Sequence, residues 1–186
     1  MLLTDPFKNY TIAPFGGKSP HIDPSVFICD GVRIIGDAVI GGDSSIWFNT
    51  VIRADINYIT IGKRTNIQDN CTVHVTKSLY AVIVGDDVTV GHGAILHGCT
   101  ISNDVLIGMG SVVLDGAIIN SHSLIAAGSL VLQKTVVPEG VLMAGVPAKI
   151  IRPLREDEVH EISQAGKNYC SYVQRYREGI GKDFAG

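Results

Sequence analysis

The chain contains 186 residues, of which 18% are charged and 6% are aromatic, together with 21 glycines. This composition favours many short strands and turns over a helical bundle, and a net charge of −3 without any basic run argues against a nucleic-acid-binding surface. No apolar stretch approaches the roughly 20 residues that cross a bilayer, and the first residues lack the basic and apolar regions of a signal peptide. We therefore expect a cytoplasmic protein with no membrane or nucleic-acid partner.

Residues 1–20 are predicted to form an extended N-terminal cap. Pro6, Pro14, Pro20 and the Gly16–Gly17 pair interrupt any regular element there. We expect this cap to lie over the first turns of the core that follows.

Residues 21–152 carry a six-residue repeat, in which an aliphatic residue opens each repeat and a small residue stands at the fifth position. The repeat reads IGDAVI, GGDSSI and WFNTVI from Ile35, is interrupted near residues 79–83, and resumes as VGDDVT and VGHGAI from Val84. No helical period fits a spacing of six, whereas a β-helix builds each repeat as one short strand and a turn. We predict that first positions point into the core. Fifth positions are predicted to sit at corners: Val39, Ser45, Val51, Thr65, Cys71, Val88, Ala94, Ser111, Ala117 and Ser129.

The four cysteines, Cys29, Cys71, Cys99 and Cys170, form no CxxC pair. Cys71 and Cys99 occupy repeat positions where another small apolar residue would also serve. We predict free thiols in a reducing compartment, not disulfides or metal ligands.

Residues 153–186 are predicted to form a C-terminal helix and a tail. Residues 154–178 are charged and permit a helix, Gly166 is a candidate break, and residues 179–186 are expected to fray. We expect the helix to act as a lid on the core and not to take part directly in catalysis. Its loose apolar stripe consists of Leu154, Val159, Ile162, Tyr169, Val173 and Tyr176.

Three of the six histidines, His74, His92 and His97, fall within one segment of the repeat. His74 and His97 each follow an inward aliphatic residue, so strand alternation points both side chains outward. His92 lies 18 residues after His74, nominally one coil of three repeats. Three imidazoles suit zinc or a neighbouring transition metal with an open position. Because a convex face cannot wrap an ion by itself, the site predicts an oligomer with its metal at the interface.

The remaining histidines, His21, His122 and His160, lack such a setting. His21 precedes the repeat, His122 is isolated within it, and His160 lies in the predicted helix. We assign all three to structure or surface.

The repeat over residues 20–150 resembles the left-handed β-helix of the hexapeptide-repeat proteins, and the order of its polar residues resembles the γ-class carbonic anhydrases. That order is R-A-D, then N-I-Q-D, then a histidine, then H-x-x-x-x-H. The resemblance implies an all-β fold, a left-handed parallel β-helix with a C-terminal α-helix, and a homotrimer with three interfacial metals. The implied metal is Zn²⁺, with Fe²⁺ or Co²⁺ as alternatives.

The resemblance also implies roles for individual residues. His74, His92 and His97 match the metal ligands, Gln68 matches the residue that hydrogen-bonds the metal-bound water, and Asn66 matches a nearby polar orienter. The family's ion pair across the subunit interface matches Arg53 and Asp55, with Asp69 in the same cluster. Tyr169 resembles a tyrosine that some relatives place near the metal.

The implied activity is the reversible hydration of carbon dioxide to bicarbonate, because a metal held by three neutral histidines lowers the pKa of its water to about 7. The sequence departs from the best-known members where they carry two glutamates. The corresponding stretches, Ile56–Tyr58 and Val75–Tyr80, contain no carboxylate. A low rate or a different chemistry follows from that absence.

Alternative functions remain open from the sequence. Hexapeptide acyltransferases, which use acetyl-CoA and one histidine as a base, also end in the G-x-P-A-K pattern of Gly145–Lys149. Some carbonic anhydrase-like relatives act as metal-dependent thioesterases or hydrolases. A structural subunit whose metal only holds the trimer together is the third alternative.

Overall fold

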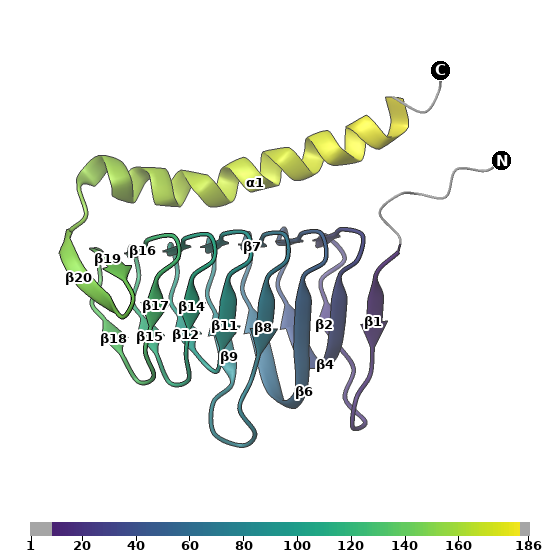
Figure 1. Cartoon of the computed structure of the whole chain (residues 1–186). Coiled ribbons are helices and arrows are strands. Elements are labelled where there is room, and N and C mark those ends of the chain that lie inside the picture. The colour runs from purple at the N-terminus through teal and green to yellow at the C-terminus, as the bar shows by residue number, and fades with distance from the viewer. Residues whose placement is uncertain (1–8, 183–186) are drawn as a thin grey trace.

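The structure is a computed structural model that describes residues 9–182, with side chains through residue 178. It confirms the predicted parallel β-helix of hexapeptide repeats followed by one C-terminal helix (Figure 1). The division of the chain at residues 20 and 152 stays a prediction. Part of the predicted cap, residues 1–8, and the last four residues of the predicted tail lie outside the described residues.

Successive coils place their strands on three faces. The histidine face consists of β1 (Thr11–Ala13), β8 (Thr72–His74), β11 (Ile95–His97), β14 (Val112–Val113) and β17 (Leu130–Val131). The open face consists of β2 (His21–Ile22), β9 (Val82–Val84), β12 (Thr100–Ile101), β15 (Ile118–Ile119) and β18 (Val136–Val137). The long strands β4 (Arg33–Ile40) and β6 (Val51–Ile61) contribute to both of these faces.

The third face, the helix face, is an eight-stranded sheet that ends in an antiparallel hairpin. It consists of β3 (Phe27–Ile28), β5 (Ser45–Ile46), β7 (Asn66–Ile67), β10 (Thr89–Val90), β13 (Leu106–Ile107), β16 (Leu124–Ile125), β19 (Val141–Gly145) and β20 (Ala148–Pro153). Helix α1 (Glu156–Lys182) contacts β5 and β10 and runs back along this face towards the first coils (Figure 1).

The core is a set of stacked aliphatic columns, one behind each face. Strand pairing places each inward side chain directly over its counterpart in the next coil, at the interstrand spacing of about 4.8 Å. Each such side chain contributes roughly 1.5–3 kcal/mol by leaving water. The column behind the histidine face is Ile34, Ile52, Val73, Leu96, Val113 and Val131, all fully buried.

The predicted repeat register is confirmed from Ile61 onward and is wrong by one residue before it. Ile34, Ile40, Ile46 and Ile52 are fully buried. Arg53, which directly follows the predicted repeat WFNTVI and would open the next one, is exposed. The predicted corner positions Val39, Ser45 and Val51 shift accordingly, and Ala38, Ser44 and Thr50 occupy the small buried sites. The cause is an insertion in β6: Ile52 pairs with Val73, 21 residues later, where a regular coil has about 18.

Two insertions therefore interrupt the regular coils beside the histidines. The first widens the turn near residues 55–58, and the second forms the loop at residues 76–80, which Thr76 and Tyr80 close as an isolated bridge. The Asn57 amide donates to the Thr76 carbonyl oxygen at 3.1 Å, which joins the two insertions. They frame the end of β8.

Helix α1 is continuous through Gly166 and extends to Lys182, so the predicted break and the start of the frayed tail at residue 179 are both wrong. A side chain at position 166 would come within 3.2 Å of the Arg64 carbonyl oxygen. Gly166 thus lets the helix approach the corners of the coils and does not end it. Of the predicted apolar stripe of the helix, Ile162 and Val173 are buried. None of the described helices is long and apolar enough to cross a membrane.

Candidate metal centre

His74 and His97 form a pair at the ends of two adjacent strands. They are opposite each other in the register of β8 and β11, and both point outward because their neighbours Val73 and Leu96 fill the core. The Nδ1 atom of His74 lies 3.1 Å from the Nε2 atom of His97. Two imidazole nitrogens this close can both reach one ion at the usual 2.0–2.1 Å.

A carboxylate faces the outer nitrogen of each ring. Asp55 Oδ1 lies 3.2 Å from His74 Nε2, and Asp115 Oδ1 lies 2.6 Å from His97 Nδ1. Carboxylates only accept hydrogen bonds, so each outer nitrogen carries the proton of its neutral ring. The two inner nitrogens then present lone pairs to one another, and that arrangement suits a cation between them.

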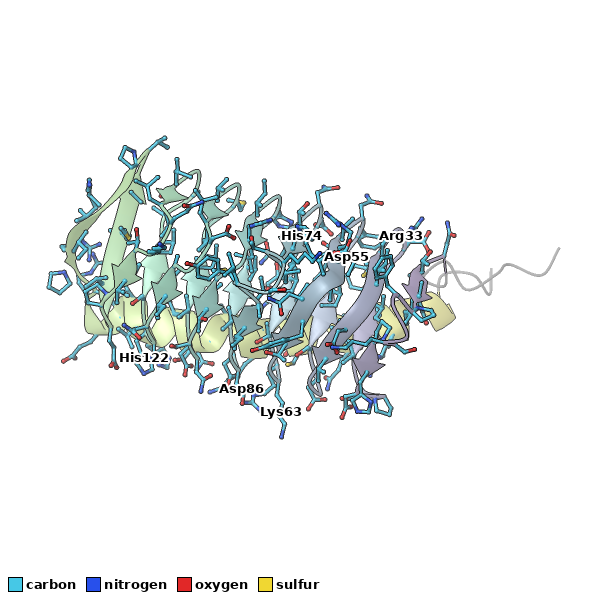
Figure 2. The ribbon with its side chains drawn as sticks, turned by 90° about the horizontal axis from the view of Figure 1, so that it is seen from below. Arg33, Asp55, Lys63, His74, Asp86 and His122 are labelled. Atoms are coloured by element: carbon cyan, nitrogen blue, oxygen red, sulfur yellow. The ribbon has the colours of Figure 1, made fainter. Side chains whose placement is uncertain are left out.

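Charge and burial favour the neutral form of the His74 ring. Partial burial and the nearby Arg53 guanidinium lower the pKa of His74, which favours the neutral imidazole that a metal requires. Burial opposes ionisation of Asp55, but hydrogen bonds from Arg53 and His74 outweigh it and lower the pKa of Asp55. Arg53 pairs with Asp55 within the same chain, and Figure 2 shows Asp55 and His74 together at one edge of the coils.

His92 lies at a different corner from the pair. It sits between β10 and β11, where the helix face meets the histidine face, and its side chain is 47% exposed. Asp69 Oδ2 lies 2.7 Å from its Nδ1 atom. Among the described residues, no three metal-ligating side chains of one chain come together as a site.

A buried amide chain fixes the backbone at His92. Gln68 accepts a hydrogen bond from the His92 N–H at 3.2 Å and donates to Asn66 at 3.2 Å. Asn66 donates in turn to Thr89 Oγ1 at 2.8 Å, and both amides are buried. The structure thus brings the predicted residues Asn66, Gln68 and Asp69 together around His92.

Tyr169 reaches the same corner from α1. It packs edge-on against Trp47, with ring centroids 5.5 Å apart, and burial raises its pKa to about 12. It therefore stays protonated at neutral pH. A cavity of about 500 Å³ opens here, lined by His92, Asp69, Trp47, Phe48, Asn49, Asn70 and the tyrosines 169, 172 and 176.

The comparisons with known proteins point to one family. Residues 98–133 match the model of the bacterial transferase hexapeptide family, six repeats. The carbonic anhydrase of Geobacillus kaustophilus is 47% identical over 89% of this chain and 91% of its own length. Gamma carbonic anhydrase 2 of Arabidopsis thaliana, a mitochondrial protein, is 45% identical over 95% of this chain. The chain belongs to the γ-class carbonic anhydrase-like family.

Membership of the γ-class family implies a metal cofactor without naming the metal. The chain spans 66% and 63% of the length of the first two Arabidopsis relatives, which are mitochondrial; the cytoplasmic location stays a prediction. A Bacillus cereus crystal structure, provisionally named an acetyltransferase, has a TM-score of 0.89 and 47% identity over 92% of this chain and 99% of that one.

Sequence reasoning missed two residues beside the candidate site, Asp115 and Thr76. Asp115 follows His97 by 18 residues, the length of one regular coil, so a search for carboxylates one coil from each histidine would have found it. Thr76 lies in the irregular loop, where no repeat predicts its neighbours.

The other histidines stay apart from the pair. His122 lies at a corner on the opposite edge of the coils from His74 (Figure 2), and His21 and His160 are exposed. The cysteines are free thiols as predicted; Cys29, Cys71 and Cys99 are buried and Cys170 is half-buried. Burial raises the pKa of Cys99 to about 12, so this thiol stays protonated.

Proposed function

We propose that this chain is a metal-dependent carbonic anhydrase that hydrates carbon dioxide reversibly to bicarbonate. The observation that carries the proposal is the His74–His97 pair, whose inner nitrogens face each other at 3.1 Å while carboxylates hold the outer ones. The names of the relatives supply the reaction class.

The ligands of one site come from two chains in this proposal. His74 and His97 stand where the histidine face meets the open face, and His92 stands at its other corner. A neighbour that sets its His92 against this pair completes a three-histidine site. Repeated around a threefold axis, this heterologous contact closes into a homotrimer with three sites.

Zinc is the metal that we propose first, with iron(II) or cobalt(II) as alternatives. When bound by neutral imidazoles, such an ion supplies a hydroxide nucleophile at neutral pH. The donor set fits because Asp55 and Asp115 leave lone pairs on the inner nitrogens of His74 and His97. Asp69 would fix the outer nitrogen of His92 in the same way.

Gln68 and Asn66 have positioning roles in this proposal. The Gln68 amide has two N–H groups, of which one donates to Asn66, and its oxygen is held by the His92 N–H. Fixed in this way, Gln68 can orient water or carbon dioxide beside the ion. Tyr169 closes the same corner, and Arg53 keeps Asp55 ionised and aimed at His74.

The residues of the two insertions bear on how the proton leaves the metal site. Asn57 and Thr76 hold each other where the best-known γ-class members carry glutamates. With no carboxylate in either stretch, proton transfer relies on solvent buffer. We expect the hydration rate to rise with imidazole concentration at fixed pH. A rate independent of buffer would contradict this account.

The deciding experiment measures metal content and carbon dioxide hydration on the same gently purified sample. We expect one metal per chain, loss of most of it in His74→Ala, His92→Ala and His97→Ala, and no change in His21→Ala and His160→Ala. Full occupancy in His92→Ala would overturn the ligand assignment. A metal-loaded parent that hydrates no carbon dioxide with any of the three metals would overturn the activity.

A metal-dependent hydrolase is the second candidate, because the cavity of about 500 Å³ beside His92 exceeds the need of carbon dioxide. Its aromatic lining suits an ester or thioester with an apolar acyl group. The parent should then hydrolyse a p-nitrophenyl ester in a metal-dependent way. Blocking the cavity with Asn49→Trp should slow the ester reaction and spare carbon dioxide hydration.

A further inference from the structure

We propose that Asp115 is the positioning residue for His97, and that Thr76 of the inserted loop holds it in place. The inference rests on the proposed function for its metal site and assigns to the loop the task of setting metal affinity. It gives the loop at residues 76–80 a role although the loop has no carboxylate.

Asp115 uses both side-chain oxygens on side chains of the site. Oδ1 lies 2.6 Å from His97 Nδ1, and Oδ2 accepts a hydrogen bond from Thr76 Oγ1 at 2.9 Å. Asp86, another corner aspartate, serves the backbone, because it accepts a hydrogen bond from the Lys63 N–H at 2.8 Å. A carboxylate whose only role was to complete a turn would likewise accept from a backbone N–H. Asp115 bonds to two side chains instead, so its contacts indicate a different role.

The surrounding backbone leaves room for this contact. Gly98 has a φ of +56°, and a side chain there would come within 2.3 Å of Asp115 Oδ1. Only glycine meets both conditions. Thr76 is fixed in turn, because Asn57 donates to its carbonyl oxygen at 3.1 Å and its N–H donates to the Tyr80 carbonyl at 2.9 Å. A hydrogen-bonded chain therefore runs from both insertions to His97.

Asp115 selects the ring form that can bind a metal. A neutral imidazole carries its proton on one nitrogen, and a carboxylate at Nδ1 draws the proton there. The Nε2 lone pair then points at His74, 3.1 Å away. Without the carboxylate, the Nε2–H form becomes accessible and directs a donor at the position where the ion binds. Such outer partners of metal-bound histidines typically change affinity 10- to 100-fold.

The test compares Asp115→Asn and Thr76→Val with the matched controls Asp86→Asn and Thr100→Val. Asp86 is another corner aspartate on the edge away from His74 (Figure 2), and Thr100 points outward from the open face. Zinc affinity is measured by chelator competition, and the His97 tautomer of the metal-free protein by ¹⁵N NMR at about pH 8. Melting curves report whether each variant is folded.

We expect Asp115→Asn to weaken zinc binding about 10- to 100-fold and to populate the Nε2–H tautomer of His97. Thr76→Val should shift both quantities in the same direction but less, and the controls should shift neither. Unchanged affinity and tautomer in Thr76→Val and Asp115→Asn would overturn the inference. If Asp115→Asn does not fold, Thr76→Val decides alone, because an unchanged tautomer there contradicts the chain from Thr76 to His97.

These readouts separate the inference from the proposed function. A parent that binds zinc through an Asp115-dependent His97 but hydrates no carbon dioxide keeps the inference and loses the function. A parent that hydrates carbon dioxide while Asp115→Asn keeps its affinity, tautomer and rate loses the inference alone.

Discussion

At the scale of single residues, adjacent positions on one strand have opposite environments. Ile119 is fully buried in the column behind the open face, and its neighbour Ile118 is 39% exposed. Ile119→Asp places an unpaired charge among stacked aliphatic side chains and should cost several kcal/mol of folding free energy. Ile118→Asp keeps its carboxylate in water and should melt close to the parent. Equal melting of the two variants would contradict the register.

Gln68 and His74 differ in what their loss should do to the metal. Gln68 touches the His92 backbone and Asn66, not the inner nitrogens of the histidine pair. Gln68→Ala should therefore retain most of the metal and lose hydration rate about 10- to 100-fold, as is typical of outer-shell partners. Metal analysis and stopped-flow hydration on one preparation check this. Loss of the metal in Gln68→Ala would show that the residue anchors the ion or the His92 corner.

At the scale of elements, α1 is fastened at its start to β20. Arg152 makes two hydrogen bonds of 2.7 Å to the Glu158 carboxylate, which also accepts from the Arg155 N–H. These contacts lower the pKa of Glu158 to about 2. A depressed carboxyl pKa contributes stability that is present above the ordinary pKa of about 4.3 and is lost as the pH falls towards 2.

The parent and Glu158→Gln should therefore differ in the pH dependence of melting. Above pH about 5 the parent should melt higher, and the difference should shrink between about pH 4.3 and 2 as the carboxylate is protonated. Thermal scans across this range measure it. Asp157→Asn is the control, since the pair of Asp157 with Arg155 is exposed. A constant difference down to pH 2 would exclude this ion pair as its source.

The helix and the insertions contain features that the sequence alone did not predict correctly. The buried residues Ile34, Ile40, Ile46 and Ile52, one on each successive face, keep a strict spacing of six. The sequence therefore contains the correct register, and the insertion in β6 hides it. Gly166 reads as a helix breaker by propensity, but packing against the Arg64 carbonyl decides its role. Local pattern predicts the elements, whereas their contacts depend on which corners meet.

At the scale of the whole molecule, periodicity made the fold predictable because every regular coil repeats the same burial pattern. The candidate ligands were predictable from their motif, and the outward direction of His74 and His97 from strand alternation. The positions of Asp115 and Thr76 were not, since two insertions change which corner residues face each other. Predicting that His92 lies apart from His74 and His97 also required the geometry of the coils.

That separation gives a test of the assembly. In a homotrimer of about three times 19.9 kDa, His74→Ala chains retain a good His92, and His92→Ala chains retain a good His74–His97 pair. Neither variant alone should hold a full set of ligands. Co-expressed or co-refolded in equal amounts, they should regain about a quarter of the parental metal and hydration rate. A random trimer places the two intact halves at about one interface in four, because each contact is heterologous and closes around the threefold axis.

Mixing His74→Ala with His97→Ala is the control, since no interface in that mixture receives an intact pair. Recovery absent from the first mixture, while light scattering still shows trimers, would mean that the three histidines do not meet across a shared interface.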